Sequence, residues 1–124
     1  MTLRDAHADM AWVVVVANGA VGLWALAAHY REQLRVGALW RATVVAEVLI
    51  FVQVALGVAL VAAQDFEVAQ FHAFYGFVAI ATVGIVYSYR QQVVPHRFLL
   101  YGLSGLFLMG LALRAMSISP VPVP

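Results

Sequence analysis

The fold is decided by ATVVAEVLIFVQVALGVALVAA, residues 42–63, in which Glu47 is the only charged side chain. A helix that crosses the hydrocarbon core of a bilayer needs about 20 mainly apolar residues, and this stretch meets that length. Three further stretches approach it, at residues 11–28, 71–89 and 98–115. The sequence therefore predicts an all-α protein with four transmembrane helices.

The composition leaves no room for a soluble domain. Of 124 residues, 65% are hydrophobic and 10% are charged, whereas soluble domains carry roughly 25% charged residues. We expect residues 1–118 to form one transmembrane domain. The proline-rich tail at residues 119–124 should be extended chain, because proline cannot continue a helix.

Several classes of function are excluded or disfavoured. The chain has no cysteine, so disulfides, thiolate metal sites and cysteine nucleophiles are absent. A net charge of +1 gives no electrostatic reason to expect nucleic-acid binding. Motifs for nucleotide binding, serine hydrolysis and zinc binding are also missing, and no catalytic constellation is complete. These missing motifs disfavour an enzyme.

Arginine placement predicts the topology. All seven basic residues are arginine, and five of them fall at residues 30–41 and 90–97, between the first and second and between the third and fourth apolar stretches. Positive loops stay in the cytoplasm, so we expect a multi-pass protein of the cell membrane with both termini extracytoplasmic. Short loops make consecutive helices antiparallel, which predicts an up-down-up-down four-helix bundle.

His7 and His72 stand out as candidate ligands. Each lies at the start of an apolar stretch, and an ionisable side chain there is a functional-site candidate by default. The first and third helices run in the same direction, so both rings should reach a similar depth near the outer surface. Two such histidines can clamp a haem iron. Ala11 and Gly76, one turn further in, would leave room for the macrocycle.

Other residues extend or compete with this interpretation. Arg114 or Arg4 could pair with haem propionates, whereas Met10 lies off the helix face that carries His7. Alternatively, the two histidines are interfacial residues hydrogen-bonded to water. His29 and His96 could form a second, inner haem pair, or could be interfacial loop residues on the cytoplasmic side.

Glu47 is the remaining anomaly within the apolar stretches. It could serve a proton or quinone-headgroup site, or it could make an interhelical hydrogen bond, which we favour. The same structural role is expected of Asn18 and Gln53. Small residues line one face of each helix, as close helix packing in a bilayer requires.

Residues 7–90 resemble one half of a haem A synthase. The resemblance lies in the helix beginning at His7, in QVALG at residues 53–57, and in FHAFYG at residues 71–76. In that family paired histidines at the outer ends of two helices are haem ligands, which implies this role for His7 and His72. The chain departs from the family in having Arg4 where a functional glutamate stands, a single half-bundle, and its fourth helix last. These departures argue against synthase activity.

Two functions are expected from these features. The first is a cytochrome b-like membrane protein with one b-type haem, acting in electron transport or as a subunit of a redox complex. The second is a cofactor-free accessory subunit or assembly factor. In either case the partners are the lipid bilayer and other membrane subunits or further copies of this chain.

Tag accessibility in intact cells tests the topology. A reporter fused to either terminus should be accessible from outside the cell, because the arginine-rich loops are retained in the cytoplasm. A tag placed in residues 30–41 should be protected. A cytoplasmic N-terminus would contradict the predicted orientation.

Overall fold

The computed structural model describes residues 2–64 and 68–118. Four long helices account for most of them: α1 (Leu3–Tyr30), α2 (Gly37–Gln64), α3 (Gln70–Tyr89) and α4 (Arg97–Ser117). Short 3-10 helices, η1 (Glu32–Leu34) and η2 (Val94–His96), lie in the α1–α2 and α3–α4 connections. The predicted all-α fold with four membrane-spanning helices is confirmed, since each helix is long and apolar enough to cross a membrane. The protein is a small multi-pass membrane protein.

The helices extend beyond the apolar stretches that mark them in the sequence. Thr2 caps α1 in a capping box: its hydroxyl accepts from the Asp5 backbone N–H, and the Asp5 carboxylate accepts from the Thr2 backbone N–H. His7 therefore lies inside α1, not ahead of it. Hydropathy marks only the part of a helix within hydrocarbon, whereas capping sets where the helix begins. The tail predicted at residues 119–124 lies outside the described residues.

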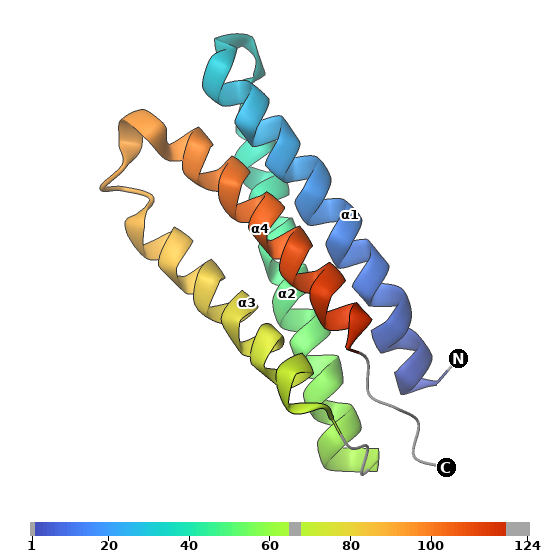
Figure 1. The fold of residues 1–124 in the computed structure, drawn as a ribbon. Coiled ribbons are helices and arrows are strands. Elements are labelled where there is room, and N and C mark those ends of the chain that lie inside the picture. Colours follow the sequence, from blue (N-terminus) through green and yellow to red (C-terminus); the bar gives the residue numbers. More distant parts are fainter. Residues whose placement is uncertain (1, 65–67, 119–124) are drawn as a thin grey trace.

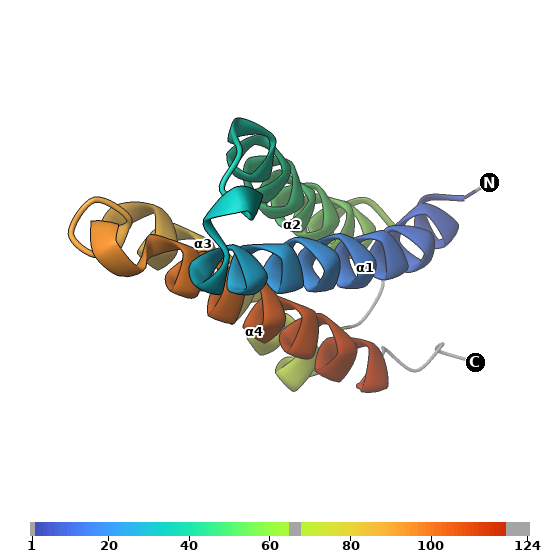
Figure 2. The same cartoon turned by 90° about the horizontal axis from the view of Figure 1, so that it is seen from above.

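The helices pack in the spatial order α2, α1, α4, α3 (Figures 1 and 2). The most extensive interface joins α1 and α4, the first and last helices, which run antiparallel. α3 packs mainly on α4, and the consecutive helices α2 and α3 make little contact. The bundle is therefore built around the α1–α4 pair rather than around successive hairpins.

Glycines allow the backbones of α1 and α4 to approach closely. A Cβ added at Gly105 would lie 2.8 Å from the Cα of Gly22 and 2.9 Å from the carbonyl oxygen of Asn18. A Cβ at Gly102 would lie 2.8 Å from the Leu26 backbone nitrogen. Only glycine fits at such distances, which is the usual means of tight helix association in lipid.

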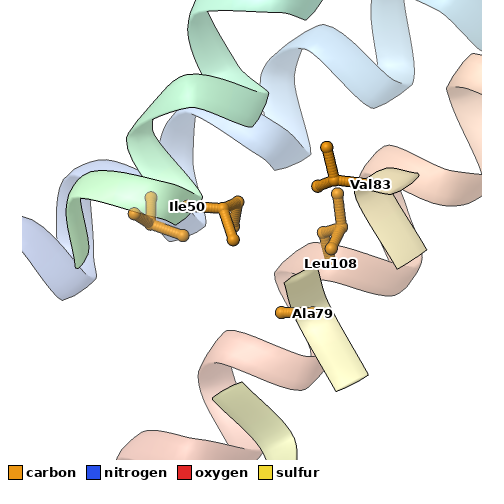
Figure 3. Packing of buried hydrophobic residues seen from close by; sticks show 5 residues of the cluster. Ile50, Ala79, Val83 and Leu108 are labelled. Atoms are coloured by element: carbon orange, nitrogen blue, oxygen red, sulfur yellow. The ribbon is translucent and has the colours of Figure 1, made fainter. Parts of the chain in front are cut away.

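Two buried clusters fill the bundle around this crossing. One cluster draws on all four helices, and Figure 3 shows Ile50 of α2 directed toward Val83 and Leu108 of α3 and α4. The other lies toward the arginine-rich connections and contains Ala25, Ala28, Leu39, Val86 and Tyr101. Large apolar side chains also point outward, as in Phe77, which is 70% exposed. Such outward side chains are the expected lipid-facing surface.

Asn18 links α1 to α2 inside the bundle. Its Nδ2 donates to the carbonyl oxygen of Val14 at 3.0 Å and to that of Ala46 at 3.2 Å. The side chain is 2% exposed. The predicted interhelical role of Asn18 is confirmed.

Alanine substitutions at two glycines of α4 test the crossing. Gly105→Ala should destabilise the protein by about 1–3 kcal/mol, the usual cost of overpacking. Gly110→Ala is the matched control, because a Cβ there meets nothing within 4 Å. It should leave stability unchanged or slightly higher, since alanine favours helix. Thermal unfolding in one detergent measures both, and equal melting temperatures for the two variants would contradict the proposed role of the crossing.

Candidate functional site

His7 and His72 come together at the end of the bundle where α1 and α3 begin. Their ring centroids lie 6.2 Å apart with an interplanar angle of 60°. The two helices otherwise make little direct contact, because α4 lies between them along most of their length. The sequence-predicted pairing of these two residues is therefore present in the structure.

The His72 ring is held by the last turn of α4. Its Nδ1 lies 2.8 Å from the carbonyl oxygen of Ala115. A carbonyl oxygen only accepts, so Nδ1 carries the proton and donates. Nε2 is then unprotonated in the neutral ring and can serve as a metal ligand. A ligating histidine in metalloproteins is usually oriented by such a hydrogen bond from its other nitrogen.

His7 contacts α2 through two residues of the QVALG stretch. Gln53 Nε2 donates to the backbone carbonyl of His7 at 2.8 Å, which confirms its predicted interhelical role. The ring lies against Gly57, where an added Cβ would meet His7 Cε1 at 3.1 Å. His7 Nδ1 and Gln53 Oε1 are both buried and lack a hydrogen-bond partner among the described residues. The site thus contains a buried ring nitrogen whose bonding capacity is unused.

The small residues near the pair behave differently from those at the α1–α4 crossing. A Cβ added at Gly76 would meet only Val54 Cγ2, at 3.9 Å, so no neighbour presses on α3 there. Ala11 of α1 is half-buried. Met10 packs against the buried cluster around Val14. The space beside Gly76 is thus not taken up by backbone.

Arg114 lies next to the residue that holds His72. It is exposed in the last turn of α4, one residue before Ala115, and its Nη1 donates to Ser117 Oγ at 3.4 Å. Arg4 lies one turn before His7 on α1. Both arginines are therefore at the histidine end of the bundle.

A second histidine pair lies at the opposite end. The His29 and His96 ring centroids are 6.0 Å apart at 55°, and His29 also stacks edge-on with Tyr30 at 4.8 Å. His96 is exposed, and no hydrogen bond to either ring is found among the described residues. The structure thus brings together the inner pair as well, without the orienting contacts that hold His7 and His72.

Arg35 has a structural role that the sequence did not indicate. Its Nε donates to the carbonyl oxygen of Ala28 at 2.7 Å and its Nη2 to that of His29 at 2.8 Å. These carbonyls belong to the last turn of α1, where helical partners run out. The sequence shows an arginine shortly after the end of the first helix. Whether its side chain turns back to the carbonyl oxygens of that helix depends on the conformation of the connection.

Glu47 is buried in α2, with 9% exposure. No hydrogen bond to its carboxyl group is found among the described residues. The buried Ser104 hydroxyl, a predicted neighbour of Glu47 in depth, donates to the carbonyl oxygen of Tyr101 in its own helix at 3.1 Å. The interhelical bond that the sequence favours for Glu47 is therefore not seen in the described part of the chain.

Comparison with known proteins gives no assignment: no protein-family model, curated protein or solved structure matches the chain significantly. Within residues 2–64 and 68–118, no three or more histidine, aspartate or glutamate side chains gather into a group that could hold a metal ion. His7 and His72, whose rings lie together with an orienting hydrogen bond at His72, are the strongest candidate site in this part of the chain.

Substitution of Glu47 tests whether its carboxyl group holds helices together. Glu47→Leu should leave the melting temperature unchanged or raise it, because no hydrogen bond is lost and a buried polar group is removed. The control Asn18→Ala, which removes the bond to Ala46, should cost on the order of 1 kcal/mol. A destabilised Glu47→Leu protein beside a normal Glu47→Gln protein would instead support the interhelical hydrogen bond.

Proposed function

We propose that this protein is a small membrane cytochrome that holds one b-type haem between His7 and His72 and transfers electrons, alone or as a subunit of a redox complex. The observation that carries this proposal is the adjacent pair of rings, with centroids 6.2 Å apart, contributed by two helices that barely touch.

The ring separation is short enough for both histidines to hold one iron. The ring centroids of His7 and His72 lie 6.2 Å apart, and each ring comes from a different helix. Both imidazoles would then contribute a nitrogen to the haem iron without a new pairing of residues.

The donor set favours haem over a bare metal ion. The histidine pair supplies two nitrogen ligands, whereas protein zinc sites almost always need at least three. A porphyrin supplies the remaining four nitrogens itself, so two histidines suffice. The hydrogen bond from His72 Nδ1 to Ala115 and the unused nitrogen of His7 both suit histidines that would hold such a group.

The surroundings fit the remaining needs of the group. A Cβ at Gly76 would meet only Val54 Cγ2, Ala11 is half-buried, and Gly57 receives the His7 ring. Arg114, with Arg4 as a second candidate, would pair with the propionates at the end of the bundle. With the arginine-rich loops in the cytoplasm, this end lies at the extracytoplasmic surface of the cell membrane.

The chain's own residues would set the reduction potential of the bound group and the access of water to it. The haem iron supplies reversible one-electron chemistry when bound. His7 and His72 would hold it, Ala115 and Gln53 would orient the two ligands, and lipid-facing helices would exclude water. The resemblance of residues 7–90 to half of a haem A synthase supports ligation by these histidines, while Arg4 argues against synthase activity.

A second candidate is a cofactor-free accessory subunit or assembly factor of a larger membrane complex. Gly84 on α3 and Gly110 on α4 are exposed, and a Cβ at either meets nothing within 4 Å. Outward-facing glycines are surplus to the packing of this chain and suit contact with a helix of another subunit. Co-purification with a partner complex and no absorbance of its own would favour this function.

The haem proposal is tested by a reduced-minus-oxidised spectrum of protein purified from haem-sufficient cells. The wild type should show the bands of a six-coordinate b-type haem. His72→Ala and His7→Ala should each lose them, because one histidine alone cannot supply both axial ligands. A colourless wild-type preparation would overturn the proposal.

His96→Ala is the matched control, since it removes an imidazole from the pair at the other end. It should keep the full spectrum and the wild-type melting temperature. Loss of about half the absorbance would show that His29 and His96 hold a second haem. Loss of all absorbance in His96→Ala, with His72→Ala unaffected, would show that His29 and His96 hold the haem and would overturn the proposed site.

A further inference from the structure

A pocket of about 420 Å³ opens at the end of the bundle opposite to His7 and His72. It lies between the α1–α2 and α3–α4 connections and is lined by residues of both, including Arg35, Arg90 and Arg97. Ligand pockets usually measure about 300–1,000 Å³, so this one can admit a chemical group of moderate size.

The walls of the pocket carry positive charge without a matching negative charge. Three arginines line it, and among residues 2–64 and 68–118 no aspartate or glutamate does. In the same part of the chain, the one carboxylate within 4.0 Å of these arginines is that of Glu32, 4.0 Å from Arg35 Nη1; its side chain is 88% exposed. An exposed pair of this kind contributes little and is screened by salt. The pocket is therefore suited to an anion.

Neighbouring aromatic rings contact all three guanidinium groups. Arg90 Cζ lies 3.8 Å from the centre of the Tyr87 ring and 5.8 Å from that of Trp40. Arg97 Cζ and Arg35 Cζ lie 5.4 Å and 5.2 Å from the centre of the Phe98 ring. Arg90 Nη1 also donates to the carbonyl oxygen of Tyr87 at 2.6 Å. A guanidinium group carries five N–H donors, so the groups not used in these bonds can reach phosphate oxygens.

Two helices begin at the pocket and add to its preference for anions. Gly37 opens α2 and Arg97 opens α4, and both residues line it. Neither helix has an acidic residue in its first turn, and no side chain caps α4. The first turn of a helix carries partial positive charge. The Arg97 and Leu39 N–H groups donate to the carbonyl oxygens of Val94 and Val36, so α2 and α4 act on an anion through this charge.

The inner wall of the pocket is apolar. It includes Leu39, which is 1% exposed, and the rings of Trp40 and Tyr101, whose centroids are 5.5 Å apart. Tryptophan and tyrosine gather where a membrane protein crosses the headgroup level. A ligand here would thus meet arginines at one side and apolar rings toward the bilayer.

We propose that this pocket binds the phosphate headgroup of an anionic phospholipid, with the acyl chains passing along the lipid-facing helices. Basic pockets between helices on one side of a membrane protein are recognised sites for acidic lipid headgroups. A free phosphate has the same charge as the lipid headgroup but no acyl chains. The aromatic wall of the pocket favours a ligand with an apolar part, and therefore a phospholipid. The proposal is independent of haem binding, because no residue is shared with the histidine pair.

Native mass spectrometry of the full chain in detergent, titrated with phosphatidylglycerol or phosphatidylcholine, tests the proposal. Phosphatidylglycerol should bind in a saturable one-to-one complex and phosphatidylcholine should not compete. The double variant Arg90→Gln/Arg97→Gln should weaken phosphatidylglycerol binding on the order of 30-fold, since each arginine near an acidic lipid contributes a factor of roughly five. Arg35 is left intact because it caps α1.

The matched control is Arg31→Gln/Arg41→Gln, which removes two arginines from the same end but outside the pocket. It should bind phosphatidylglycerol as the wild type does. Equal weakening in both double variants would show a diffuse charge effect and overturn the site. Equal binding of phosphatidylcholine would also overturn it. Inorganic phosphate that displaces the lipid at similar concentration would identify a site for a soluble phosphate instead.

Discussion

The close crossing of α1 and α4 is the contact on which the rest of the structure depends. Lipid is as apolar as the helix surfaces, so apolar area alone does not drive helices together, and contact must come from packing and polar bonds. Gly22 and Gly105 bring the two backbones within the reach of a single Cβ. Because α4 runs antiparallel to α1, its last turn is carried back to the depth of His7. The carbonyl of Ala115 then lies where His72 can reach it.

This arrangement explains how two histidines can meet although their helices scarcely touch. α3 packs on α4, and α4 packs on α1, so α4 sets the separation of α1 and α3. The two rings come near each other beside the last turn of α4, where Ala115 holds His72. α2 adds a third support, since Gln53 binds the backbone at His7 and Gly57 receives the ring. Residues from all four helices thus determine one ring-to-ring distance.

The sequence predicts those parts of the fold that depend on hydropathy and chain direction. Four apolar stretches give four helices, and the two reversals between the first and third helices give His7 and His72 the same depth. The sequence could not predict that α1 packs more extensively against α4 than against α2. The rotation and register of each helix depend on side-chain packing with its neighbours. The helix ends also differ, since Thr2 and Asp5 extend α1 beyond its apolar part. The acceptor for His72 and the contact of Gly57 with His7 follow from that register and not from local sequence.

The register matters because a helix couples sliding to turning. One residue corresponds to a rise of about 1.5 Å and a rotation of about 100°. A slip of one residue in α1 would therefore turn the His7 ring away from His72, even though its depth would barely change. Hydrophobic side chains facing lipid tolerate such a slip, whereas the glycine contacts with α4 and the Asn18 bond to Ala46 do not. The polar and glycine contacts in the middle of the bundle are thus what fix the geometry of the histidine pair at its end.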